Sequence, residues 1–169
     1  LVPLAAPHSP RSGGQWQIEL LPGDEQAYDT RCVRVKVSSP LVPPRVVEVD
    51  VARGEARVLH SEEAHAGFDA RRYDAGRLWA TAADGVRIPM SYLARKDVDA
   101  SQLGWPTLLY GYGSYGASSD PAWDAERLAL VDTGVAHGIA RVRGGGEMGP
   151  AWHAAGRRHE KAVSVSDMV

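Results

Sequence analysis

The sequence predicts a β-rich first part joined to a second part of mixed α/β type, on the basis of two patterns and the break between them. Short segments of alternating polarity fill residues 15–62, and such alternation is typical of antiparallel strands with one buried face. After residue 74 the pattern changes to a hairpin followed by strand, helix and strand, which indicates an α/β domain. Residues 62–74 are mainly charged and small, so we place the boundary there.

Four strands are expected in the first part. Valines at every second position define the two central strands, and shorter runs flank them, at residues 15–20, 32–38, 45–51 and 56–60. Three prolines, Pro40, Pro43 and Pro44, separate the second strand from the third, because proline cannot lie in a central ladder. Strands at this spacing, with turn residues between them, are typical of a propeller blade or a sandwich.

The second part is expected to begin with a hairpin. Its strands are predicted at residues 77–83 and 86–94, and Asp84 and Gly85 form the tight turn between them. A short, continuously apolar run at residues 107–110 predicts a strand buried on both faces.

The remainder of the second part alternates helix and strand. Helical segments are expected at residues 121–133 and 148–161, with a strand at 135–142 between them. Asp120 is the expected N-cap of the first helix, because a side-chain oxygen there accepts a hydrogen bond from a free helical N–H. Ser164 or Ser166 is expected to cap a helix that follows.

The composition is that of an ordinary globular protein and excludes several classes. The 169 residues are 44% hydrophobic and 24% charged, with a net charge of -2, so neither a disordered tail nor a nucleic-acid-binding surface is indicated. No apolar run approaches the roughly 18 residues that a membrane helix needs. Residues 1–15 lack a secretory pattern and the single cysteine, Cys32, fits a reducing compartment. We therefore expect a cytoplasmic protein, and a first residue other than Met suggests a piece of a longer one.

A glycine-rich loop follows the strand predicted at 107–110. Residues 111–116 (GYGSYG) match the pattern G-x-G-x-x-G. A dinucleotide site also needs the third glycine to open a helix and an acidic residue about 20 positions further on, after a strand; neither requirement is met. A plain turn and a ligand-binding loop at the carboxyl edge of a sheet are the other two interpretations. In a ligand-binding loop, Tyr112 and Tyr115 would supply a phenol donor and an aromatic wall.

A second glycine run, residues 143–147 (RGGGE), follows the next predicted strand and is expected at the same edge of the sheet as the first. Consecutive glycines can form a backbone nest for an anion, and a flexible turn with a surface arginine is the alternative. The histidines have no metal-ligand spacing, so no metal site is expected. His137 and Cys32 are interpreted as packed residues of strands. No serine stands in a G-x-S-x-G context, so no nucleophile elbow is present.

In their order and spacing, these motifs resemble the prolyl oligopeptidase family of serine peptidases. The resemblance rests on three segments and their neighbours, 77–85 (RLWATAADG) with Ile88 and Pro89, 108–116 (LLYGYGSYG), and 143–149 (RGGGEMG) with Trp152. The continuation at residues 114–117 (SYGA) looks like the oligopeptidase B branch. Because the family combines a β-propeller with an α/β-hydrolase domain, the resemblance implies a β-rich C-terminal piece of a propeller over residues 1–72. It implies the N-terminal part of an α/β-hydrolase domain over residues 73–169.

The resemblance also implies roles for four residues. Tyr112 corresponds to the tyrosine that donates its hydroxyl to the oxyanion, and Tyr115 to the aromatic residue on the S1 side of the cleft. Asp120 matches one of two aspartates that help to bind basic side chains, whereas Ala122 stands at the place of the other. Arg143 is a candidate substrate contact whose loop lies near the cleft and has a more structural role.

The implied function is that of a serine-type endopeptidase that cleaves short peptides after Arg or Lys by acyl-enzyme hydrolysis. Its partner would be an oligopeptide, and no cofactor, nucleic acid or membrane is expected. The family's Ser, Asp and His triad lies downstream of these residues, so the chain alone is expected to be inactive, and poorly soluble because of exposed sheet edges. Two alternatives stay open: a non-catalytic β-rich binding module with an α/β appendage, and a dinucleotide-binding fragment.

Overall fold

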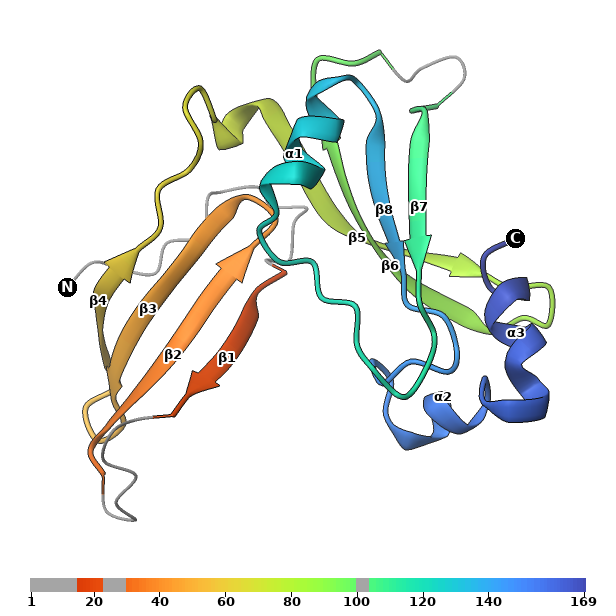
Figure 1. Ribbon diagram of the computed structural model, residues 1–169, viewed down its shortest axis with the longest axis horizontal. Helices are drawn as coiled ribbons and strands as arrows, with labels where there is room; N and C mark the ends of the chain where they lie inside the picture. Colours follow the sequence, from red (N-terminus) through yellow and green to blue (C-terminus); the bar gives the residue numbers. More distant parts are fainter. Residues whose placement is uncertain (1–14, 23–29, 100–103) are drawn as a thin grey trace. The chain divides into compact units, whose positions relative to one another are not determined.

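The computed structural model describes residues 15–22, 30–99 and 104–169 (Figure 1). Contacts between residues divide the chain into two compact units. Unit 1 consists of residues up to 70 together with 121–125, and unit 2 consists of residues 71–120 together with 126–169. The first break between the units therefore falls within residues 62–74, where the sequence changes its pattern.

Unit 1 is one antiparallel sheet whose strands pair in chain order. Its strands are β1 (Gln17–Leu21), β2 (Cys32–Ser39), β3 (Val42–Asp50) and β4 (Glu55–Ser61). Val37, Val42 and Val47 are buried, because alternation places a row of valines on the inner face of the pleated strands. The four expected strands are confirmed. Cys32 is exposed, contrary to expectation.

The prolines of β3 contradict a second expectation. Pro43 and Pro44 lie within β3, which is a central strand of the sheet. The pairing of β3 with β4 starts only at Arg45, and its pairing with β2 shifts register between Val37 and Ser39. This bulge leaves the two prolines outside the regular ladder, so no amide hydrogen is required of them.

Unit 2 contains a mixed sheet in the order β5-β6-β8-β7. A short 3-10 turn, Ala70–Arg72, leads into β5 (Tyr73–Thr81), which forms the expected antiparallel hairpin with β6 (Arg87–Arg95). β8 (Ala136–Ala140) pairs antiparallel with β6 and parallel with β7 (Thr107–Gly111). Helix α1 (Ala125–Asp132) connects β7 to β8, because parallel strands need a crossover connection.

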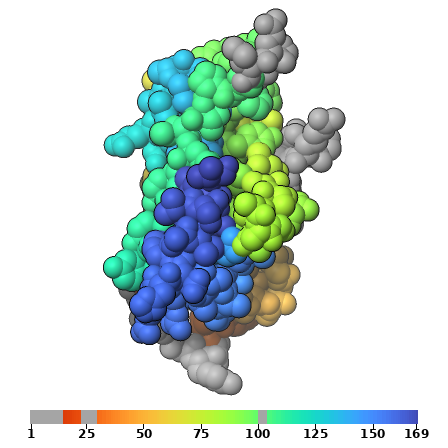
Figure 2. Space-filling model, turned by 90° about the vertical axis from the view of Figure 1, so that its right-hand side faces the viewer, coloured from red at the N-terminus to blue at the C-terminus, as the bar shows by residue number. Residues whose placement is uncertain are grey.

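The core of unit 2 lies between the sheet and the segments after β8. Ile88, Ala140 and Val142 form a buried cluster, against which Trp152 and Met168 pack. Those segments are α2 (Pro150–Ala154), the 3-10 turn η2 (Arg158–Glu160) and α3 (Lys161–Ser166). Figure 2 shows this C-terminal part, in blue, beside the yellow-green β5–β6 hairpin and the green β7 region.

Helix α1 begins later than expected. Residues 121–124 are not helical, so Asp120 is not an N-cap. The ring of Trp123 packs edge-on against Phe68, with 4.7 Å between ring centroids, and residues 121–125 belong to unit 1 by their contacts. Tertiary packing of the indole therefore overrides the local helix pattern.

Two further expectations about unit 2 are wrong. β7 lies at the edge of the sheet rather than being buried on both faces, and Leu108 and Tyr110 are 51% and 49% exposed. Ser164 lies inside α3 and Ser166 is its last residue, so neither caps a helix. Of the helices in the described part of the chain, none has the length and apolar character to cross a membrane.

Candidate functional site

The two glycine-rich loops follow neighbouring strands of unit 2. β7 and β8 are parallel, so their carboxyl ends lie together at the edge where α/β sheets bind ligands. Residues 112–124 connect β7 to α1, and residues 141–149 connect β8 to α2. The structure therefore brings both sequence motifs to one place.

Main-chain hydrogen bonds join the two loops directly. The N–H of Gly116 donates to the carbonyl of Gly144 over 3.1 Å, and the N–H of Gly146 donates to the carbonyl of Ala117 over 3.1 Å. Each loop therefore supplies a hydrogen-bond acceptor for a backbone N–H of the other, and the two loops are joined rather than independent turns.

Gly113 and Gly144 stand where the loops touch. Their φ angles are +60° and +98°, in the left-handed region that favours glycine. A Cβ on Gly144 would overlap the carbonyl oxygen of Gly113, and a Cβ on Gly113 would overlap the side chain of Val142. The glycines are thus required by the packing of one loop on the other.

This use of the glycines argues against the dinucleotide alternative. A dinucleotide site needs the third glycine of the motif to open a helix whose N-terminus faces the pyrophosphate. Gly116 is instead followed by an extended loop, and α1 begins only at Ala125.

Tyr112 and Tyr115 present their rings at this edge. Tyr112 directly follows β7 and is 45% exposed, and Tyr115 is 89% exposed with a φ of +56°. Such a φ is uncommon for a non-glycine residue and indicates local strain. Within the described ranges the Tyr112 hydroxyl makes no hydrogen bond, so it is free to donate one to an anion.

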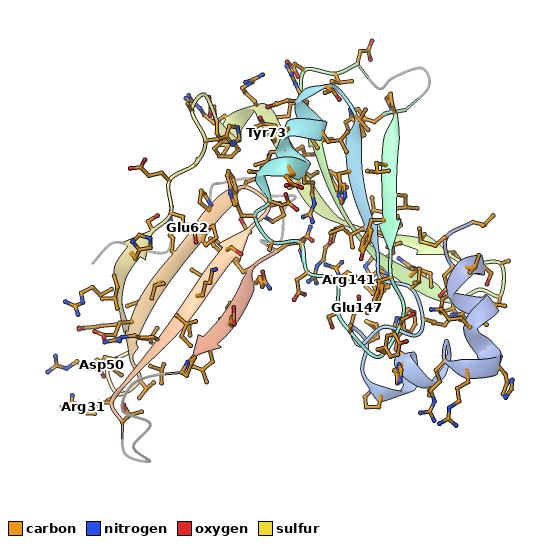
Figure 3. All side chains as sticks on the ribbon, viewed as in Figure 1. Arg31, Asp50, Glu62, Tyr73, Arg141 and Glu147 are labelled. Carbon is orange, nitrogen blue, oxygen red and sulfur yellow. The ribbon has the colours of Figure 1, made fainter. Side chains whose placement is uncertain are left out.

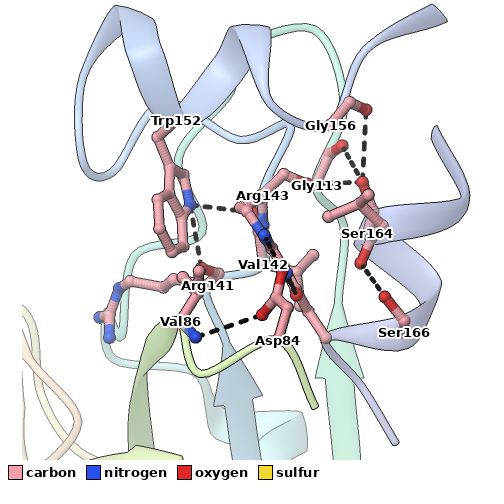
Figure 4. A network of polar contacts seen from close by, with 12 residues as sticks. Asp84, Val86, Gly113, Arg141, Val142, Arg143, Trp152, Gly156, Ser164 and Ser166 are labelled. Atoms are coloured by element: carbon pink, nitrogen blue, oxygen red, sulfur yellow. Dashed lines mark hydrogen bonds and ion pairs between the residues drawn. The ribbon is translucent and has the colours of Figure 1, made fainter. Parts of the chain in front are cut away.

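Arg143 joins three parts of unit 2 from beneath the loops (Figure 4). The buried guanidinium donates to the carboxylate of Asp167, just after α3, over 2.5 Å and to that of Asp84, in the β5–β6 turn, over 2.6 Å. Its backbone N–H also donates to Asp167 over 2.9 Å. The Asp167 hydrogen bonds raise the pKa of the guanidinium above its usual value. Arg143 is therefore a charged, internal tie between β8, α3 and the hairpin.

The Arg143 contact makes the stability of unit 2 depend on pH through Asp84. The hydrogen bond from Arg143 holds the pKa of the Asp84 carboxyl below its ordinary value of 3.8. Since folding favours the ionised form, the stabilisation is complete above that value and is lost as pH falls through the lower pKa of the folded state. We expect urea titrations to show wild type more stable than Asp84→Asn near neutral pH, with the difference shrinking below pH 3.8. A difference independent of pH would contradict this assignment.

Asp120 and Arg141 place opposite charges near the same edge. Asp120 is exposed, whereas Arg141, the residue after β8, is 6% exposed and forms no hydrogen bond or ion pair through its guanidinium within the described ranges. Burial lowers the pKa of Arg141, the positive charge of Arg77 adds to this, and Glu147 and Asp120 oppose it. Figure 3 shows Arg141 and Glu147 at the end of β8. The sequence motifs gave no reason to single out Arg141.

A polar network behind the loops was also missed by sequence reasoning. Its members come from the β5–β6 turn, from α3 and from the residue after α3: Asp84, Lys161, Ser164 and Asp167. They lie up to 59 positions from their partners. An acidic residue in a hairpin turn and a serine in a helix are too common to predict such contacts without the fold.

Comparison with known proteins agrees with the motifs, although no family model matches the chain. Protease 2 from Moraxella lacunata is 34% identical over 145 residues, and dipeptidyl aminopeptidase BI from Pseudoxanthomonas mexicana is 37% identical over 157 residues. Each alignment covers 86% of this chain and 21% of the relative.

Solved structures give the same result. Oligopeptidase B from Trypanosoma brucei, with covalently bound antipain, matches with a TM-score of 0.83 and 33% identity over 94% of this chain. Oligopeptidase B from Leishmania major matches with a TM-score of 0.83 and 34% identity over 95% of this chain. Each match covers 22% of the solved chain.

The two sheets, the paired glycine loops and these similarities define a β-rich segment that is homologous to part of these peptidases. The chain belongs to the prolyl oligopeptidase family. It spans about a fifth of the length of the relatives that it matches.

Proposed function

We propose that this chain supplies the oxyanion donor and part of the substrate cleft of a serine endopeptidase that cleaves short peptides after Arg or Lys. In this proposal unit 1 is the C-terminal piece of a β-propeller, because a four-stranded antiparallel sheet in chain order is the form of a propeller blade. Unit 2 is the N-terminal part of an α/β-hydrolase domain, because a strand–helix–strand crossover follows its hairpin.

The position of Tyr112 is the observation that carries the proposal. β7 is the third strand of unit 2 and leads through residues 112–124 to the helix α1. In α/β-hydrolases one oxyanion donor comes from the loop between the third strand and the first helix. Tyr112 opens that loop with an exposed ring and, in the described part of the chain, an unengaged hydroxyl.

The chemistry requires such a donor. When a serine attacks the scissile carbonyl, its C=O bond becomes a C–O⁻ bond, and the negative charge must be stabilised until the leaving amine departs. A phenol hydroxyl aimed at the developing oxyanion does this without taking part in the proton transfers. The nucleophile and the base are not assigned to residues of this chain, so we expect no turnover by the chain alone.

The other site residues have supporting roles in this proposal. Tyr115, almost fully exposed and three residues after Tyr112, lines the S1 side of the cleft, and the exposed Asp120 attracts a basic substrate side chain. Arg143 remains a predicted substrate contact. Because its guanidinium is bonded to Asp84 and Asp167, we propose that it serves the substrate through the loop that it holds. A cytoplasmic location, suited to the exposed thiol of Cys32, completes the proposal.

The test is Tyr112→Phe in an active enzyme. We suggest a chimera in which this chain replaces the matching segment of oligopeptidase B from Leishmania major. With an arginyl peptide substrate, Tyr112→Phe should lower kcat by about 10²–10³-fold, the effect of losing one oxyanion donor, while KM changes little. Tyr110→Phe, an exposed tyrosine two residues earlier in β7, is the matched control and should leave kcat unchanged. An unchanged kcat in Tyr112→Phe would refute the role of Tyr112.

A further inference from the structure

We infer that Lys161 is a positioning residue that fixes the loop carrying Tyr112, an inference that rests on the function proposed above. Lys161 is the first residue of α3. Its Nζ donates to the carbonyl oxygen of Gly113 over 2.6 Å, to Ser114 Oγ over 2.8 Å and to Ser164 Oγ over 3.2 Å. The ammonium group therefore contacts the two residues that directly follow Tyr112.

The number of hydrogen bonds made by Lys161 indicates whether its amine serves as a fixed cation or as a base. A lysine ammonium has three N–H donors and no acceptor, and all three donors are used here. This arrangement suits a fixed cation rather than a base that would activate Ser114. Hydrogen bonds from a charged donor are stronger than neutral ones, so the Gly113 carbonyl is held firmly toward α3.

Ser164 extends the clamp to the second loop. Its side chain is buried, and its hydroxyl donates to the carbonyl of Arg143 over 2.5 Å. Lys161 and Ser164, one helical turn apart on α3, thus hold the loop after β7 and the loop after β8. The helix sets the spacing between the two loops.

The loop needs such support at this point. Tyr112 stands between Gly111 and Gly113, and glycine gives the backbone more freedom than any other residue. An oxyanion donor, however, must lie within a few tenths of an ångström of its working distance. Without the ammonium, the Gly113 carbonyl and the Ser114 hydroxyl lose their shared partner, and the Tyr112 hydroxyl should sample positions away from the oxyanion.

Amide hydrogen exchange in the 169-residue chain tests the clamp itself. In Lys161→Met, the amides of Gly116, Ala117 and Gly146, whose hydrogen bonds hold the loops, should exchange about tenfold faster or more, the effect of losing charge-assisted hydrogen bonds. Buried amides of β6 and β8 should exchange as in wild type. Lys161→Arg should recover part of the protection, and Lys161→Gln replaces Lys161→Met if that variant does not fold. Unchanged loop exchange, or equal acceleration throughout unit 2, would overturn the inference.

The matched control is Lys96→Met. The Nζ of Lys96 also donates to a carbonyl, that of Arg71, over 3.1 Å at an exposed site. Removing it should leave exchange of the loop amides unchanged. Accelerated loop exchange in Lys96→Met would show that any lost lysine loosens unit 2, and would count against a specific role for Lys161.

Kinetics of the chimera separate positioning from mere structural support. Lys161→Met should lower kcat by about 10–100-fold, in line with the cost of misplacing a catalytic group, with KM nearly unchanged and partial recovery in Lys161→Arg. In the double variant with Tyr112→Phe, Lys161→Met should cause little further loss, because it acts through Tyr112. A full, additive loss would overturn the inference. If Tyr112→Phe slows the enzyme and Lys161→Met does not, the positioning role of Lys161 is wrong and the proposed function stands. If Tyr112→Phe has no effect, the proposed function itself is wrong.

Discussion

Replacing Gly144 with alanine is expected to destabilise unit 2 severely. Gly144 has a φ of +98°, and a Cβ there would overlap the carbonyl oxygen of Gly113 and crowd the carbonyl oxygen of Gly156. Both carbonyl oxygens belong to the backbone and cannot rotate aside as the end of a flexible side chain can. We expect Gly144→Ala to lower the free energy of unfolding by about 4 kcal/mol or more, a size reached only by exceptional single substitutions. Urea unfolding followed through the amide signals of β6 and β8 measures it.

Gly149→Ala separates steric overlap from backbone strain. Gly149 lies in the same loop and has a similar φ of +88°, but nothing lies within 4 Å of a Cβ built on it. Its substitution should cost only about 1–3 kcal/mol, the strain of a backbone conformation (φ 88°, ψ -171°) that glycine alone adopts readily. If Gly144→Ala and Gly149→Ala destabilise unit 2 equally, then the close packing of the two loops does not contribute as described.

Asp167→Ala is expected to produce the second large loss. The Asp167 side chain is completely buried and pairs with Arg143, which is itself 10% exposed in its side chain. Without Asp167, Arg143 keeps only Asp84, whose side chain is 51% exposed, as its ion-pair partner. Loss of one partner of a buried ion pair typically costs about 3–5 kcal/mol. The variant also leaves the backbone N–H of Arg143 without its acceptor. Urea unfolding of unit 2 should therefore show a lowered midpoint with an unchanged slope.

Asp97→Ala provides the matched control for Asp167→Ala. Asp97 also pairs with an arginine, Arg95, but its side chain is 57% exposed. Exposed ion pairs contribute about 0–1 kcal/mol, so Asp97→Ala should be close to wild type in stability. Equal losses in the two variants would mean that burial of the Arg143 pair is not what makes it important.

The strands were largely predictable because apolar and polar residues alternate along a strand that has one buried face. The valines of β2 and β3 and the Asp84-Gly85 turn carry local information that needs no knowledge of the fold. The apolar run at 107–110 correctly predicted the strand β7 but not its place at the edge of the sheet. An apolar sequence does not show whether a strand has one neighbouring strand or two. Residues 121–124 have a helical sequence pattern but are not helical, because Trp123 packs on Phe68 instead.

The site was predictable in part for a related reason. Glycine runs after two strands predicted that the loops carrying Tyr112 and Arg143 would lie at one edge, and the structure brings them together. Which side chains support those loops depends on contacts between distant positions. Lys161 meets Gly113 across 48 positions, and Arg143 meets Asp84 across 59. No local pattern marks such partners before the fold is known.

The affinity of a peptide aldehyde for the chimera reports directly on whether the Tyr112 hydroxyl stabilises a transient oxyanion. The active-site serine adds to the aldehyde, and the resulting oxyanion occupies the position of the one formed in catalysis, so the adduct binds as a transition-state analogue. We predict that Tyr112→Phe weakens binding of the aldehyde by the same factor as it lowers kcat/KM, while binding of the matching unreactive peptide amide is unchanged. Equal aldehyde affinity in wild type and Tyr112→Phe would mean that the Tyr112 hydroxyl does not stabilise the oxyanion.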